Sequence, residues 1–281
     1  MGSYLRPDTL EEALAALGSG PRTVLAGGTD YYPARVGLPL DDDILDITAI
    51  GELRGIEAGN GEIRIGAMVR WRELANASLP PAFDGLRRAS RQIGGMQVQN
   101  AGTVCGNVCN ASPAADAVPN LLVLEASVEL ASATGIRTVP ISTFITGNRT
   151  TTLRADELAT ALVMPAPPEG ARSCFAKLGA RAYLVISIAM VAALIAPAAD
   201  GTVAAARVAV GACSAVAQRL AALERALSGA RIGPDLARIP EPGHLAPLAP
   251  IDDVRGSAEY RIEAALTLIR RALAELGAGA R

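Results

Sequence analysis

The sequence predicts an α+β fold with two N-terminal subdomains that enclose a cleft, followed by a C-terminal domain with a small antiparallel sheet and helices. Two segments rich in glycine and hydroxyl side chains, 25–33 and 97–119, lie far apart in the chain. A linker with several prolines spans 165–170, and two long apolar segments beyond it flank Asp200-Gly201, a typical hairpin turn. The domains expected from these observations are 1–57, 58–170 and 171–281.

Composition narrows the possible functions. The 281 residues have a net charge of −2 with both signs interspersed, and only 3% are aromatic. Nucleic-acid binding is therefore not indicated, because it requires a basic surface and rings on which bases stack. The longest apolar run, 184–199, is shorter than the roughly 20 residues that a membrane-spanning helix needs. With no signal-peptide pattern at the N-terminus, we expect a cytoplasmic protein without a membrane span.

The cysteines and the single histidine exclude several kinds of catalytic site. Cys105 and Cys109 are spaced C-x₃-C, but no second pair completes the four-ligand set of a structural zinc or iron–sulfur site. Two small buried thiols are the simpler interpretation. His244 is the one histidine of the sequence and lies in a proline-rich segment. A Ser-His-Asp, Cys-His or multi-histidine catalytic site is therefore not expected. We predict no catalytic side chain and no metal site in this chain.

Local signals predict the elements of the first half. Thr9 and Glu12 form a capping box ahead of a leucine face, and Gly18 ends that helix. Ser112 can cap a helix with Pro113 at its first position, which places Asp116 in the first turn. The other elements expected here are strands at 23–26, 44–47 and 62–66, a helical turn at 31–35, helices from 71 and at 82–93, and helical structure at 121–125.

Hydrophobic patterning predicts the second half. The apolar stripe of Ile262, Leu266, Ile269, Leu273 and Leu276 indicates a helix at 257–276. The other expected elements are strands at 127–131 and 158–165, a hairpin of 187–196 and 203–211, an amphipathic helix at 218–227 and irregular chain at 230–256.

The first glycine segment, Gly27-Gly28-Thr29-Asp30, directly follows a predicted strand. A strand, a glycine turn and a helix start direct backbone N–H groups at an anion. The pattern is not the dinucleotide-binding G-x-G-x-x-G, because the glycines are adjacent and no third follows, although Asp46 lies near the expected acidic position. Alone, this segment is equally consistent with an ordinary turn. A second such loop at 100–116 indicates that the two clamp a long, phosphate-bearing ligand.

Several motifs resemble the flavin-binding medium subunit of molybdenum hydroxylases, a family that includes bacterial xanthine dehydrogenase and aerobic carbon monoxide dehydrogenase. The segments that match its two FAD loops are Leu25-Ala26-Gly27-Gly28-Thr29-Asp30, Asn100-x-Gly102-Thr103-Val104-x-Gly106-Asn107 and Asn110-Ala111-Ser112-Pro113-Ala114-Ala115-Asp116. Further matches are Ile65-Gly66-Ala67, Lys177-Leu178-Gly179-x-Arg181 and 253–261. The resemblance covers essentially the whole chain and implies the two-subdomain FAD fold of the PCMH/vanillyl-alcohol-oxidase type.

The resemblance also implies which residues hold the cofactor. The FAD diphosphate would be wrapped by Ala26, Gly27, Gly28, Thr29 and Asp30. Thr103, Gly106 and Asn107 would hold the other side of the phosphates and the ribityl chain. Asp116 would bond the adenosine part, and Ser112 would stabilise the turn before it. Lys177 would lie near the isoalloxazine, where a cation stabilises reduced flavin, and Tyr183 could cover the ring; for Lys177 a solvated surface position is the alternative.

The chain departs from the family pattern at two positions. Cys105 replaces the first glycine of Gly-Gly-Asn within the cofactor-binding loop, and we expect extended backbone there, which tolerates a Cβ. Gln99 stands where the family often has arginine. No histidine lies near the site, so FAD is expected to be bound non-covalently.

The resemblance implies an electron-transfer role. A large molybdopterin-binding subunit would oxidise the substrate, and a small subunit with two [2Fe–2S] clusters would pass electrons to FAD in this chain. NAD⁺, a quinone or oxygen would then accept them, within a dimer of heterotrimers. A flavin-free structural or nucleotide-sensing subunit with the same fold is the alternative. A stand-alone oxidase would need acid–base residues that the C-terminal third does not offer.

Overall fold

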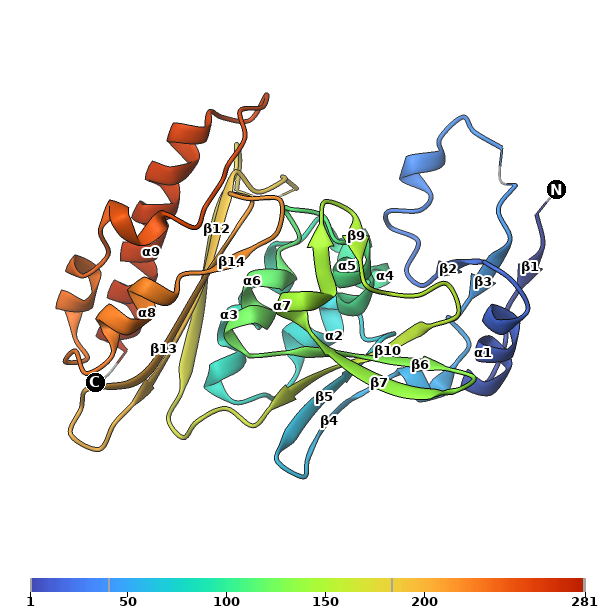
Figure 1. The fold of residues 1–281 in the computed structure, drawn as a ribbon, viewed down its shortest axis with the longest axis horizontal. Coiled ribbons are helices and arrows are strands. Elements are labelled where there is room, and N and C mark those ends of the chain that lie inside the picture. The colour runs from blue at the N-terminus through green and yellow to red at the C-terminus, as the bar shows by residue number, and fades with distance from the viewer. Residues whose placement is uncertain (1, 40, 183, 280–281) are drawn as a thin grey trace.

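The computed structural model describes residues 2–39, 41–182 and 184–279 and shows the expected α+β class. Within this part of the chain, no helix is both long and apolar enough to span a membrane. The strands of the described residues form four sheets, and Figure 1 shows the three larger ones following one another along the long axis of the molecule.

The N-terminal sheet is small and parallel, and the glycine segment leaves from its edge strand. Its order is β1 (Tyr4–Leu5), β3 (Ile44–Asp46), β2 (Thr23–Leu25). α1 (Leu10–Gly18) packs beside it with the predicted cap, since the Glu12 N–H donates to the Thr9 hydroxyl at 3.3 Å. Asp46 is a structural residue, because its carboxylate accepts from the Tyr4 hydroxyl and the Thr48 N–H.

The second sheet is antiparallel and forms the floor of the central part. Its order is β4 (Ile56–Gly59), β5 (Glu62–Gly66), β10 (Leu158–Pro165), β6 (Ser127–Ser132), β7 (Gly135–Pro140). The predicted domain boundary at residue 57 falls inside β4, whose partner β5 lies beyond it. The division at 57 stays a prediction. The second sheet begins at Ile56, so that division would cut through β4.

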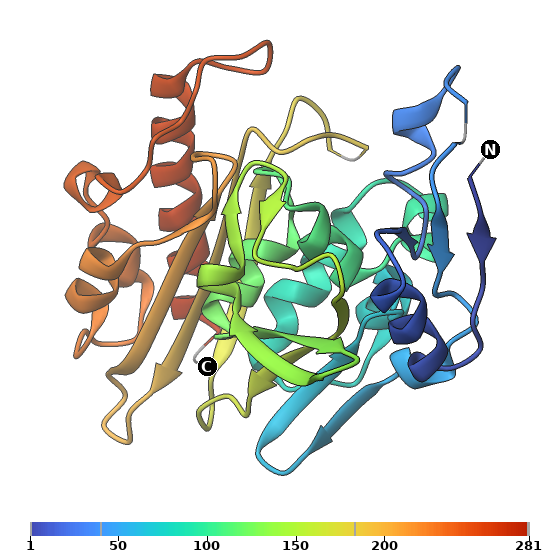
Figure 2. The same cartoon turned by 45° about the vertical axis from the view of Figure 1, so that its right-hand side comes forward.

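Helices fill the space between this sheet and the C-terminal domain (Figures 1 and 2). They are α2 (Trp71–Asn76), α3 (Asp84–Gln92), α4 (Met96–Ala101), α5 (Val104–Asn110), α6 (Ala117–Val123) and α7 (Ile141–Phe144), the last leading into the two-stranded hairpin of β8 (Ile145–Gly147) and β9 (Thr150–Thr151). The expected loop at 100–116 was largely wrong, because most of it forms α4 and α5. The helix expected from Ser112 begins only at Ala117, since residues 112–115 form a turn closed by the Ala115 N–H and the Ser112 carbonyl at 2.9 Å.

The C-terminal sheet is buried on both faces. Its order is β11 (Arg172–Leu178), β12 (Ala189–Pro197), β13 (Val203–Gly211), β14 (Gln218–Arg219). Along β12, Met190, Ala192 and Leu194 enter the core shared with the central helices, whereas the alternate residues face α8 (Ala221–Leu227) and α9 (Ala258–Ala278). This two-sided burial explains why the apolar run has no polar alternation. The predicted helix at 218–227 was wrong at its start, where β14 extends the sheet.

Candidate functional site

A cavity of about 990 Å³ is lined by all three parts of the chain. Its walls come from residues within the segments 24–35 and 67–116, from Ile47, from Arg149, Leu153 and 157–159, and from Arg181 and 184–186. The site residues predicted from the two glycine segments all line it: Ala26, Gly27, Gly28, Thr29, Asp30, Thr103, Cys105, Gly106, Asn107, Ser112 and Asp116. Tyr183 lies outside the described residues.

The two glycine segments touch each other directly. A Cβ added to Gly27 would lie 2.1 Å from the carbonyl oxygen of Ala101, and one added to Gly102 would lie 3.0 Å from the Thr29 hydroxyl. Both glycines therefore permit backbone contact between parts of the chain that are distant in sequence. Gly28 has a different role, because its φ of 67° turns the chain out of β2.

The second wall is built around α5. Thr103 caps this helix, with its hydroxyl accepting from the Gly106 N–H at 3.0 Å. Asn107 accepts from the Ala117 N–H at 3.4 Å and so ties α5 to α6. Cys105 lies in right-handed helix, not in the extended backbone that we expected. Because helix accommodates a Cβ without strain, replacing glycine with Cys105 carries no backbone cost.

A buried ion pair stands behind the cavity wall. The Lys177 ammonium on β11 donates to Asp116 Oδ2 at 2.6 Å, and the Ser187 hydroxyl donates to Oδ1 at 2.6 Å. The side chains of Lys177 and Asp116 are 7% and 4% exposed. Burial raises the pKa of Asp116, while Lys177 and then Ser187 oppose that rise. The three residues join the start of α6 to the C-terminal sheet and to the segment that enters β12.

This ion pair changes two of the predictions. Lys177 is neither solvated nor among the residues that line the cavity, so the surface alternative was wrong. Asp116 lines the cavity, but each of its carboxylate oxygens already accepts from a protein donor. The geometry favours a positioning role for Asp116 over the predicted direct bond to adenosine.

Sequence reasoning overlooked Arg149, which bridges the two glycine segments. Its Nη1 donates to Asp30 Oδ2 at 3.0 Å and to Asn110 Oδ1 at 2.6 Å. The only sequence signal was an arginine directly after Gly147-Asn148, two residues typical of turns. In the structure Arg149 has a φ of 54°, which glycine or asparagine normally adopts.

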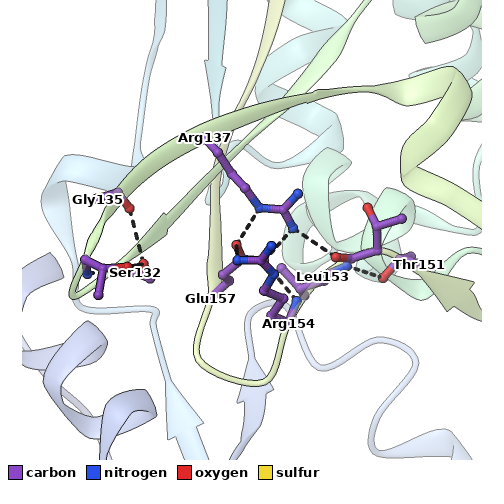
Figure 3. A network of polar contacts seen from close by, with 9 residues as sticks. Ser132, Gly135, Arg137, Thr151, Leu153, Arg154 and Glu157 are labelled. Atoms are coloured by element: carbon purple, nitrogen blue, oxygen red, sulfur yellow. Dashed lines mark hydrogen bonds and ion pairs between the residues drawn. The ribbon is translucent and has the colours of Figure 1, made fainter.

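A polar network holds the chain that follows Arg149 (Figure 3). Arg137 on β7 donates to both carboxylate oxygens of Glu157, through Nε at 2.5 Å and Nη2 at 2.7 Å. Arg137 Nη2 also donates to the Thr152 carbonyl at 2.9 Å, and the Arg154 N–H donates to Glu157 at 2.9 Å. Glu157 lines the cavity with its charge already paired, so it does not repel an anionic ligand.

Among the four thiols, only Cys109 has a pKa below its usual value. The interaction between the Cys105 and Cys109 side chains lowers the pKa of Cys109, while that interaction and burial raise the pKa of Cys105. Burial raises the pKa of Cys174 to about 12 and that of Cys213 to about 11. Because thiolates are the reactive form, Cys109 should reach a reactive state at the lowest pH.

We expect iodoacetamide at pH 8 to alkylate Cys109 first, and a ligand in the cavity to slow that reaction, since Cys109 lines it. Peptide mass spectrometry over a time course measures both. Prior labelling of Cys174 or Cys213 would contradict this order.

Comparisons with known proteins agree along the whole chain. Residues 1–167 match the family model of the FAD binding domain in molybdopterin dehydrogenase, and residues 175–276 match that of the CO dehydrogenase flavoprotein C-terminal domain. The glyceraldehyde dehydrogenase medium chain of Sulfolobus acidocaldarius is 31% identical, over 98% of each chain. The xanthine dehydrogenase FAD-binding subunit of Escherichia coli O157:H7 is also 31% identical, over 99% of this chain and 97% of the relative.

Solved structures give the same result. A chain of carbon monoxide dehydrogenase from Hydrogenophaga pseudoflava superposes with a TM-score of 0.88 at 29% identity, covering 99% of this chain and 97% of the other. Quinoline 2-oxidoreductase from Pseudomonas putida 86 gives 0.89 at 25% identity, covering 100% and 98%. With both halves matched and the predicted glycine segments brought together at one cavity, the chain belongs to the family of FAD-binding medium subunits of the molybdenum hydroxylases.

Proposed function

We propose that this chain accepts electrons on FAD from the iron–sulfur clusters of a partner subunit and passes them to NAD⁺ or another acceptor. The observation that carries the proposal is the cavity between the two contacting glycine segments, which extends toward the C-terminal domain. Bound FAD would supply the redox chemistry, and the chain would supply binding, orientation and tuning of the potential.

The residues present fit this cofactor. Residues Ala26 to Asp30 and the α5 residues Gly106 and Asn107 all line the cavity, where close approach of main chain suits a diphosphate. The carboxylates of Asp116 and Glu157 are already paired with cations. We assign Asp116 and Lys177 to positioning the wall beside the cofactor, because their charges are paired with each other.

An acceptor has a place to bind in this proposal. A second pocket of about 420 Å³ shares Ser112, Ala114 and Ile186 with the main cavity. Its floor is stabilised by Arg261 of α9, which donates to Asp253 at 2.6 Å and to the Ile188 carbonyl at 2.6 Å. A small redox ring held there would lie directly beside the FAD cavity.

The names of the relatives support the proposed partners. Chains about 30% identical to this one belong to enzymes named for glyceraldehyde, xanthine and nicotine. These different names support a substrate that is selected outside this chain, by a large molybdopterin-binding subunit, with a small [2Fe–2S] subunit between the two. We propose a cytoplasmic dimer of heterotrimers. The flavin-free alternative rested on Cys105, whose helical conformation removes the physical reason for it.

Purification of the full chain by itself tests the proposal. We expect a yellow protein that releases FAD on acid precipitation, as a non-covalent cofactor does. In the complex, bleaching of the flavin by substrate and its recovery on adding NAD⁺ or a quinone identifies the acceptor. A colourless protein that takes up no FAD contradicts the proposal.

A further inference from the structure

We propose that Arg149 is a cofactor-binding residue whose guanidinium pairs with the diphosphate of FAD. The inference rests on the proposed function, because it takes FAD as the occupant of the cavity. It adds a side-chain cation to a site whose two glycine segments, 25–33 and 97–119, contain no basic residue.

The backbone at Arg149 is held in an unfavourable conformation. Arg149 is the third residue of the turn 147–150 between β8 and β9, with a φ of 54°. Its N–H donates to the carbonyl of Ala111 at 2.8 Å, and Ala111, which ends α5, has a φ of 49°. Two non-glycine residues in left-handed conformation therefore meet at one hydrogen bond beside the cavity. Such strain persists where the surrounding structure imposes it, and it is concentrated at functional sites.

The Arg149 guanidinium is oriented but not saturated. Nη1 makes both of its bonds, to Asp30 and to Asn110. No hydrogen bond to Nε or Nη2 is found among the described residues, and the side chain is 60% exposed while lining the cavity. A guanidinium has five donors arranged for bidentate contact with phosphate oxygens. Nε and Nη2 remain available for such a contact.

The charges of the residues that line the cavity also favour Arg149 as the contact to the diphosphate. Asp30 is acidic and half-exposed, so it would repel a diphosphate unless a cation stood beside it, and Arg149 is that cation. Arg35 donates through Nε to Asp42 at 2.7 Å and lies over the Tyr31 ring, and Arg181 donates to the Leu184 carbonyl at 3.0 Å. Only Arg149 among these three contacts both glycine segments, where the diphosphate is expected.

Calorimetric titration of the deflavinated full chain with four ligands tests the inference. FAD and ADP carry a diphosphate, FMN carries one phosphate, and riboflavin carries none. For Arg149→Ala we expect the Kd for FAD and ADP to rise about 10- to 100-fold, as for loss of a charged hydrogen bond. The FMN Kd should rise less, and the riboflavin Kd should stay unchanged. Arg149→Lys should be intermediate, because it keeps the charge but not the fork.

Two further variants separate binding from folding. Arg149→Gly suits the positive φ, so its unfolding temperature should equal or exceed that of the wild type while its FAD affinity falls as in Arg149→Ala. Arg154→Ala removes the same charge from an exposed side chain outside the cavity lining and should change none of the affinities. FAD binding by Arg149→Ala should also depend less on salt than that of the wild type.

The outcomes are distinguishable. If the wild type binds no FAD, the proposed function fails. If the wild type binds FAD and the Arg149 variants bind it equally well, only the Arg149 inference fails. Equal weakening of riboflavin and FAD would also overturn it, because Arg149 would then shape the cavity without contacting the diphosphate.

Discussion

Replacing Gly27 with alanine is expected to abolish FAD retention and to destabilise the chain. The added Cβ would lie 2.1 Å from the Ala101 carbonyl oxygen and 2.7 Å from Gly102 Cα. These are backbone atoms, which cannot move aside as a flexible side chain does, so the two glycine segments must separate. Overpacking of this kind costs about 1–3 kcal/mol of unfolding free energy or more. The same separation widens the cavity where the cofactor is gripped.

Urea denaturation and FAD content per chain measure both effects. Gly51→Ala is a matched control, because a Cβ there meets no atom within 4 Å and Gly51 is not among the positive-φ glycines. We expect that variant to stay within about 0.5 kcal/mol of the wild type and to keep its flavin. A Gly27→Ala protein with full FAD content would show that the contact between the segments does not matter.

Breaking the Lys177–Asp116 pair is the second change with a large expected effect. Asp116→Asn leaves a buried ammonium without its counter-charge, and removal of one partner of a buried pair costs about 3–5 kcal/mol. The double variant Asp116→Asn, Lys177→Met removes both charges and should recover most of that loss. Glu275→Gln breaks the exposed pair with Arg88, where about 0–1 kcal/mol is expected.

The pH dependence of Lys177→Met has a definite sign. Burial already raises the pKa of Asp116, and loss of Lys177 raises it further. A carboxyl whose folded pKa lies above its unfolded value binds a proton more tightly when folded, so stability falls as pH rises from the unfolded pKa through the folded one. Lys177→Met should therefore be less destabilised at pH 5 than at pH 7. Equal destabilisation at the two pH values would contradict this expectation, because it would mean that Asp116 stays ionised in the folded variant and binds no additional proton.

Elements with a strong local signal were predicted well. The capping box at Thr9 and the apolar stripe of α9 gave correct helices, because caps and 3.6-residue periodicity act within a few residues. The stripe was less exact in detail: Leu266 is only partly buried, whereas Leu268, which it omitted, is buried. β1, β4, β7 and β11 were overlooked; the first three are short or exposed strands, which are specified mainly by their partners.

The second glycine segment illustrates a limit of local reasoning. Its small, uncharged composition correctly indicated a cavity wall, but it was interpreted as a loop and most of it is helical. Glycine and asparagine have low helix propensity, and α5 is stabilised by burial of Val104, Cys105 and Val108.

The sequence alone was enough to predict the fold class, the family and the two segments that meet at the cavity. Each of these depends on motifs whose residues are close together in the chain. The tertiary structure decided how the charges are placed. Lys177 and Asp116 are 61 residues apart in the sequence, and Arg149 and Asp30 are 119 apart. Neither pairing can therefore be predicted from a local sequence pattern. Burial then changes what each charge does: it makes Asp116 a partner of Lys177, while exposure leaves Arg149 with unused donors in the cavity that Gly27 and Gly28 also line.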